Sequence, residues 1–214
     1  KNLIDCENMS TELKKAGYNV INDVASSDIV VINTCGFIES AKKEAIDAIL
    51  GVADFKAPEG SVKKIIVSGC LSQRYPEDIL KELPEVDAVL GTAHYGDIVD
   101  VVAKLVTELD NSEAEKINLT SGKGGFTHLV KDRELSTEAF AWLKIGEGCL
   151  HRCSFCAIPL IRGTFVSRPM EDILDEAKII AGRGVKEIIL AAQDTTNYGI
   201  ELYKERRLAE LLKN

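Results

Sequence analysis

Two short aliphatic runs constrain the fold of this chain more than any other feature. Residues 28–33 (Asp-Ile-Val-Val-Ile-Asn) and 64–68 (Lys-Ile-Ile-Val-Ser) are typical of strands buried on both faces of a parallel sheet. Helical periodicity follows each of them, at 38–54 and around 77–83. Strands that alternate with helices in this way predict an α/β fold with a parallel, doubly wound sheet.

The alternation continues on both sides of these runs. We expect helices at 3–16 and 95–109 and strands at 18–21 and 86–91. The next segment is dominated by Asn, Ser, Gly and Lys and is predicted to be a linker, at 110–138.

The last part of the chain repeats the order strand, helix, strand, helix. The strands are expected at 139–145 and 186–192, and the helices at 170–182 and 202–214. This order is that of the opening portion of a β/α barrel, whose functional loops follow the strands. The expected division of the chain is a first domain at 1–109, a linker at 110–138 and a truncated barrel domain at 139–214.

Three cysteines share one short segment of this last part. Cys149, Cys153 and Cys156 have the spacing C-x3-C-x2-C. Three thiolates on one loop can hold three irons of a 4Fe–4S cluster and leave the fourth iron open to a small molecule. A structural zinc site is the first alternative, although it usually takes four ligands in C-x2-C pairs. A disulfide with one free thiol is the second, and it requires an oxidising compartment.

Two further cysteines each follow a predicted strand directly. Cys35 comes after the run 28–33, and Cys70 comes after 64–68. The carboxyl ends of parallel strands lie along one edge of a sheet, so these residues predict a second metal site. The alternative is that both are small buried hydrophobic residues. Cys6 falls inside the first predicted helix and is not assigned as a ligand.

Composition limits the class of protein. The 214 residues are 45% hydrophobic and 28% charged, which is ordinary globular composition without a stretch long enough to span a membrane. The net charge of −8 is a poor match to a phosphate backbone, so we expect no direct nucleic-acid contact by this segment. Six cysteines without an export signal favour a reducing, cytoplasmic location. The first residue is not Met and the last residues have a helical pattern, so we expect an internal fragment.

With both cysteine sets in view, the chain resembles the methylthiotransferases of the radical S-adenosylmethionine (SAM) superfamily. The matching runs are N-T-C-G-F-I at 33–38, G-C-L-S-Q-R-Y at 69–75 and the three-cysteine loop. The resemblance implies two 4Fe–4S clusters, one in a flavodoxin-like domain and one in the partial barrel that binds SAM. Cys35 and Cys70 would supply two of three thiolates of the first cluster. The third would lie upstream of Lys1, and Cys6 stands where the family usually has Ser.

The run D-T-T-N-Y-G-I-E-L-Y at 194–203 resembles the branch of the family that modifies a ribosomal protein, with Glu201 where Asp is usual. The implied reaction adds a methylthio group to the β-carbon of an aspartate of small-subunit ribosomal protein twelve. A radical formed from SAM would break the unactivated C–H bond, with an electron from a donor such as flavodoxin or ferredoxin. The resemblance also implies that Phe155 packs on the SAM adenine and that Gln193 and Asp194 lie near SAM. Their alternative roles are core filling for Phe155 and loop capping for the other two.

Several alternatives remain open. The alternatives to this prediction are a transfer RNA (adenosine) methylthiotransferase, a non-enzymatic iron–sulfur carrier, and a fragment too incomplete to be active. Arg162 and Arg168 either steer a carboxylate or SAM, or are solvated surface residues. The lysine pairs at 42–43 and 63–64 are expected on solvated faces.

Overall fold

The computed structural model describes residues 2–56, 60–109, 111, 114–123, 125–126 and 129–214. The chain divides into two compact units. The N-terminal unit comprises Asn2 and Glu12–Lys123, and the C-terminal unit comprises Leu3–Thr11 and Gly124–Asn214. Helix α1 (Asn2–Lys15) is therefore divided between the units, because its residues Leu3–Thr11 belong to the C-terminal unit. Among the described residues, no helix is both long and apolar enough to cross a membrane.

A four-stranded, wholly parallel sheet forms the centre of the N-terminal unit. The strands follow the order β1 (Ile29–Thr34), β2 (Lys64–Gly69), β3 (Ala88–Leu90) and β4 (Ile117–Leu119). Every residue of β2 is buried, whereas β1 at the edge of the described sheet is mostly half-buried. This burial explains why the run at 64–68 is almost entirely aliphatic.

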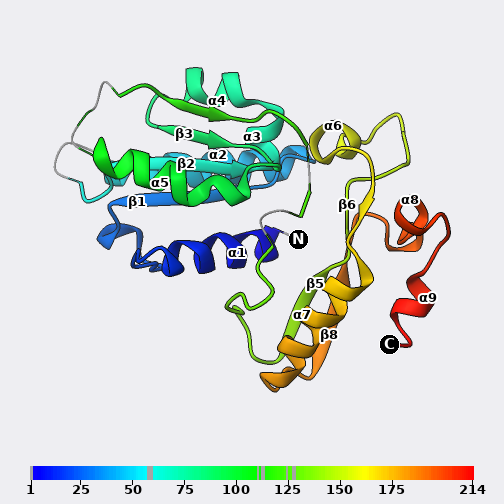
Figure 1. Cartoon of the computed structure of the whole chain (residues 1–214). Coiled ribbons are helices and arrows are strands. Elements are labelled where there is room, and N and C mark those ends of the chain that lie inside the picture. Colours follow the sequence, from blue (N-terminus) through cyan, green and yellow to red (C-terminus); the bar gives the residue numbers. More distant parts are fainter. Residues whose placement is uncertain (1, 57–59, 110, 112–113, 124, 127–128) are drawn as a thin grey trace. The chain divides into compact units, whose positions relative to one another are not determined.

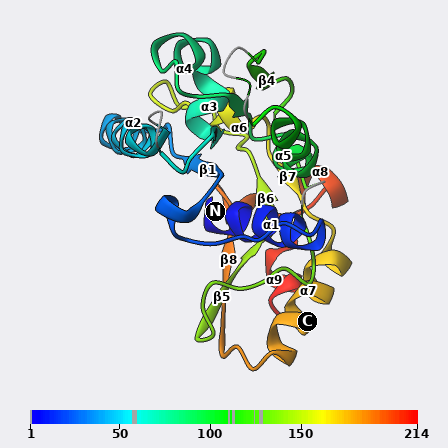
Figure 2. The same cartoon turned by 90° about the vertical axis from the view of Figure 1, so that its left-hand side faces the viewer.

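Helices cover both faces of this sheet, with α2 (Glu39–Ala53) and α5 (Ile98–Thr107) on opposite sides (Figures 1 and 2). The α2 helix packs Ala45, Ile49 and Val52 against Ile65 and Val67 of β2. The helices of the unit after α1 are α2 (Glu39–Ala53), α3 (Cys70–Arg74), α4 (Pro76–Glu82) and α5 (Ile98–Thr107), with 3-10 turns η1 (Val24–Ser26), η2 (Asp54–Lys56) and η3 (Tyr95–Asp97).

The C-terminal unit is built on a strand–helix–strand element. Strands β5 (Phe140–Lys144) and β8 (Glu187–Ala191) are parallel neighbours, and α7 (Met170–Gly182) packs Ile173 and Ile180 against β5. A short antiparallel pair, β6 (Gly146–Glu147) and β7 (Val166–Ser167), lies between them in sequence. The remaining elements are β6 (Gly146–Glu147), α6 (Ile158–Arg162), β7 (Val166–Ser167), η4 (Thr195–Asn197), α8 (Ile200–Tyr203) and α9 (Leu208–Leu211).

The predicted α/β class and its parallel strands are confirmed, and two local predictions are wrong. Residues 18–21 form no strand, and Ile21 is exposed. The single helix expected at 202–214 is two short helices, because Lys204 has φ +64° and a left-handed residue ends a right-handed helix. The segment 110–138 contains strand β4, which was too short to show a periodic pattern.

Candidate iron–sulfur loop and its buried ionic support

The three clustered cysteines lie on the loop between β6 and α6. All six cysteines lie in the described part of the chain and none is in a disulfide; Cys153 is exposed, and Cys149 and Cys156 are half-buried. The backbone N–H of Cys156 donates to the carbonyl of Cys153 at 3.0 Å, which closes a tight turn. The N–H of Cys149 donates to the carbonyl of Gly163 at 3.2 Å. The hydrogen bond of Cys149 thus fixes the start of the loop, and the three cysteines follow one another within eight residues.

Gly148 shows why the loop begins where it does. Its φ is +75°, and a Cβ at this position would lie 2.3 Å from the carbonyl oxygen of Thr164. Only glycine accepts both the left-handed backbone and this close approach. The residue before Cys149 is therefore pressed against the segment that leaves α6.

A buried ionic cluster lies directly beneath this loop, and sequence reasoning missed it. The carboxylate of Glu147 accepts from Arg162 Nη1 at 3.1 Å to each oxygen and lies 3.1 Å from Lys144 Nζ. Asp5 of α1 pairs with the same Lys144 and lies 3.4 Å from Arg162 Nη1. The four side chains are at most 3% exposed. Among these four described side chains, the charges of two acids and two bases balance, as buried charges require.

Gln193 belongs to this cluster. Its Nε2 donates to Glu147 Oε1 at 2.8 Å from the end of β8. The amide therefore anchors the acid that precedes the cysteine loop. A single signal in the sequence hinted at the cluster: Lys144 interrupts an otherwise apolar strand pattern, with Glu147 three residues later.

Arg162 and Arg168 are not solvated surface residues, so that alternative is wrong. Arg168 is buried, pairs with Glu176 and donates to the carbonyl of Asp172 at 3.2 Å. Burial lowers the pKa of Arg168 to about 10, which still leaves it a cation at neutral pH. Both arginines are held by acids of the protein itself.

One lysine of the predicted solvated pairs is buried as well. Lys64 donates to the carbonyl of Asn111 at 2.8 Å and lies 3.5 Å from Asp87 Oδ1. Lys64 is the first residue of β2. Its charge is compensated by Asp87, which directly precedes β3. The expectation of a solvated face is therefore wrong for Lys64.

The segment after β8 makes a second polar contact with the cysteine loop. Asp194 accepts from the N–H of Thr196 at 3.0 Å and also from its hydroxyl, so it caps η4. These hydrogen bonds lower the pKa of Asp194 below its ordinary 3.8, and the bond from the Thr196 hydroxyl has the larger effect. His151 Nε2 lies 3.0 Å from Asp194 Oδ2. The loop-capping role of Asp194 is thus present.

Phe155 stands out from the loop. Its side chain is 92% exposed. The alternative that it fills the core is therefore wrong.

Cys35 and Cys70 lie on adjoining turns in the N-terminal unit. Thr34 and Gly69, which precede them, are paired residues of β1 and β2. A Cβ on Gly36 would lie 2.9 Å from Leu71 Cα, so the backbones of the two turns are in contact. Cys70 begins α3 and is buried, whereas Cys35 is half-buried. Cys6 lies within α1, as expected.

The donor chemistry of both places fits iron–sulfur ligation, since cysteines outside disulfides are gathered on one loop and on two adjoining turns. Across the residues that the structure describes, no three His, Cys, Asp or Glu side chains already converge as ligands of one metal ion.

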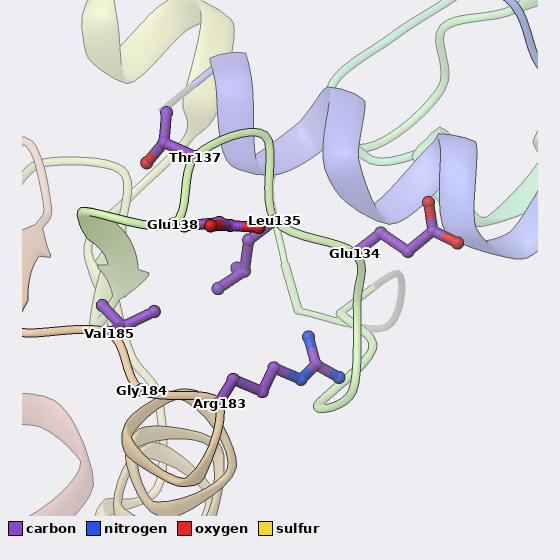
Figure 3. Close-up of a pocket in the computed structure, with 7 residues that line it drawn as sticks. All are labelled: Glu134, Leu135, Thr137, Glu138, Arg183, Gly184 and Val185. Carbon is purple, nitrogen blue, oxygen red and sulfur yellow. The ribbon is translucent and has the colours of Figure 1, made fainter.

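A cavity of about 610 Å³ lies at the other end of the strands (Figure 3). It is lined from the segments that lead into β5 and β8, and the Arg183 side chain reaches across it. Arg183 donates to the carbonyls of Arg133 and, at 2.9 Å, Asp132, so its guanidinium braces the backbone. In β/α units this end of the strands serves stability rather than catalysis.

Comparison with known protein families divides the chain in two. The profile described as Uncharacterized protein family UPF0004 matches residues 1–91, and that of the Radical SAM superfamily matches 143–214. The second match contains the three-cysteine loop. This part of the chain therefore has the sequence pattern of the radical SAM superfamily.

The curated relatives narrow the family. The chain is 46% identical to the ribosomal protein uS12 methylthiotransferase RimO of Acetivibrio thermocellus, 47% to that of Thermoanaerobacter sp. and 45% to that of Clostridioides difficile, each over 100% of this chain. Over its whole length, the chain is therefore similar to methylthiotransferases of the RimO type. It spans about half the length of these relatives, 47% of each.

Solved structures support the fold. Two structures of the radical SAM methyltransferase TsrM from Kitasatospora setae superpose with TM-scores of 0.58 and 0.60 at 12% and 14% identity. Each superposition covers 98% of this chain and 47% or 48% of the other. At this identity the likeness concerns the fold alone.

Proposed function

We propose that the protein is a radical SAM enzyme that adds a methylthio group to the β-carbon of an aspartate of ribosomal protein uS12. The observation that carries this proposal is the identity of 45–47% over the whole chain to proteins of that name. The two cysteine sets support it independently, because the chemistry needs thiolate ligands at two places.

Cys149, Cys153 and Cys156 hold one 4Fe–4S cluster, and Cys35 and Cys70 supply two thiolates of a second. When bound with SAM, such a cluster supplies a radical able to break an unactivated C–H bond, which acid–base groups cannot do. The exposed thiol of Cys153 and the free thiols beside it are open to assembly of the cluster.

The protein's own residues orient the reactants. Phe155 offers an exposed ring that can stack on the adenine of SAM. Gln193 and Asp194 border the cofactor from the end of β8, where ligands of β/α units bind. Gln193 also holds Glu147 beneath the loop, so its cofactor role and its supporting role coexist.

The architecture that goes with this function has three parts. Residues 1–109 form a flavodoxin-like domain, 110–138 a linker that also contributes strand β4 to its sheet, and 139–214 the first part of a radical SAM β/α barrel. The ranges of the two family matches, 1–91 and 143–214, support this division. The first turns of α1 add to the barrel part, because Leu3–Thr11 packs with the C-terminal unit.

The partners follow from the reaction. The substrate is the ribosomal protein, the co-substrate is SAM, and an electron donor of the flavodoxin or ferredoxin class delivers the electron. A ribosomal substrate and free thiols together favour the cytoplasm.

The test uses the full-length protein after anaerobic reconstitution. About eight irons per chain and reductant-dependent cleavage of SAM to deoxyadenosine are expected. About four irons with SAM cleavage would mean that the Cys35–Cys70 site is misassigned. Zinc, or iron without SAM cleavage, would reject the enzyme and leave a carrier or a structural metal protein.

A further inference from the structure

Helix α1 places an acid inside the C-terminal unit, far along the chain from the residues that it meets. Asp5 is fully buried and forms an ion pair with Lys144, which is 139 residues away. It also lies 3.4 Å from Arg162, which is 157 residues away. Lys144 ends β5 and Arg162 ends α6, so these two elements meet at one side chain of α1.

Among the described residues, Asp5 is one of two acids that pair with these buried cations. Glu147 is the other, and it contacts both of them. Replacing the Asp5 carboxylate by an amide shifts the local balance by one positive charge in a place where the side chains are at most 3% exposed. A buried charge without its counter-charge is strongly unfavourable, so Lys144 and Arg162 would turn toward Glu147 or toward solvent.

Any such movement reaches the cysteine loop through Glu147. This residue precedes Gly148, whose N–H lies 3.4 Å from Glu147 Oε1. Gly148 has no room to adjust, since a Cβ there would collide with Thr164. The start of the loop is therefore held between the ionic cluster on one side and a rigid backbone contact on the other.

We propose that Asp5 is a positioning residue for the cysteine loop. It acts through Lys144 and Arg162 on Glu147 and so fixes the backbone on which Cys149 begins. The loop of the C-terminal unit is thus complete only when the first turns of α1 are in place. What the loop binds rests on the proposed function, whereas the positioning can be measured without any cofactor.

Asn8 offers a matched control on the same helix. It is also buried; its Oδ1 accepts from the N–H of Val130, and its Nδ2 donates to the carbonyl of Ile4 at 2.7 Å. Asn8→Ala therefore loosens the attachment of α1 to this unit without touching the ionic cluster. Asp5→Asn keeps the shape of the side chain and removes its charge.

The first measurement is hydrogen exchange of residues 146–156 in the metal-free, full-length protein. We expect Asp5→Asn to speed exchange in this segment about tenfold or more, and Asn8→Ala to leave it within about twofold of the original protein. Equal effects of the two variants, or no effect of Asp5→Asn, would overturn the proposal. Should Asp5→Asn fail to fold, Asp5→Glu, which keeps the charge and displaces it by one methylene, is compared with Asn8→Ala by the same criterion.

The second measurement uses the reconstituted protein in a background with Cys35→Ala and Cys70→Ala, so that iron reports on the three-cysteine loop alone. Asp5→Asn is expected to lower the iron content and to change the electron paramagnetic resonance spectrum that SAM induces, and Asn8→Ala is not. An unchanged spectrum at full iron content in Asp5→Asn would contradict the positioning role. If the parent background itself shows no response to SAM, the proposed function fails, and the exchange result still decides the positioning.

Discussion

Gln193 and Glu147 are joined by a 2.8 Å hydrogen bond that links the end of β8 to β6, 46 residues earlier in the chain. Because Glu147 also holds Arg162 and Lys144, the end of the second barrel strand and the start of the cysteine loop share one polar structure. The segment expected to border SAM and the loop expected to bind iron are therefore mechanically connected.

Substitution of Gln193 tests this connection. Gln193→Ala should lower the free energy of unfolding by about 1.5–3 kcal/mol, the usual range for a hydrogen bond to a charged group. Gln193→Glu should cost more, because it places a second carboxylate against Glu147. Urea denaturation monitored by circular dichroism measures both. A Glu variant as stable as the original protein would show that this hydrogen bond does not form.

Gly148 should be intolerant of any side chain. Gly148→Ala is expected to lower the free energy of unfolding by about 2 kcal/mol or more, since it combines a left-handed backbone with a collision at Thr164. Gly182→Ala at the end of α7 is the control, because a Cβ there has no neighbour within 4 Å. It should be neutral or stabilise by up to about 1 kcal/mol. Thermal unfolding of the two variants side by side decides the matter.

Iron content should distinguish the cysteines that are cluster ligands from Cys6. Single Ala replacements of Cys149, Cys153 and Cys156 should each remove about four irons from the reconstituted full-length protein. Cys6→Ala, in contrast, should keep the full content, since Cys6 lies within α1 and is not assigned as a ligand. Loss of a cluster in the Cys6 variant would mean that this thiol takes part in ligation.

Asp194 should titrate at unusually low pH. Its pKa lies below 3.8 because the Thr196 hydroxyl and N–H donate to the carboxylate. A carboxylate with a lowered pKa in the folded state contributes stability above about pH 3.9, and this contribution disappears as pH falls through the lower value. Carbon-13 NMR titration of the carboxyl group measures the pKa. Thr196→Val should raise it, and an unchanged value would contradict the capping geometry.

The sequence predicts secondary structure best where apolar residues form a continuous run or repeat with a single period. The aliphatic runs at β1 and β2 located the parallel sheet, and the pattern at 170–182 located α7 to the residue. Cys35 and Cys70 could be placed on one edge because strand direction alone decides it. These are local patterns combined with general topology.

The ionic cluster could not be predicted in the same way. Asp5 and Lys144 are 139 residues apart, and nothing in the sequence of α1 marks Asp5 as an interior residue. The alternative in which Arg162 and Arg168 are solvated rested on the usual preference of charged side chains for the surface, which pairing overrides in this unit. Likewise Lys204 ends α8 by a backbone conformation that its residue type does not favour.

Mass spectrometry of ribosomal protein uS12 tests the central claim most directly. The full-length, reconstituted protein is incubated with uS12, SAM and a reductant, with transfer RNA offered in a parallel reaction. The account predicts a mass increase of one methylthio group on a single aspartate of uS12 and unmodified transfer RNA. Methylthiolated adenosine in the transfer RNA with unmodified uS12 would contradict it and would assign the chain to the RNA-modifying branch.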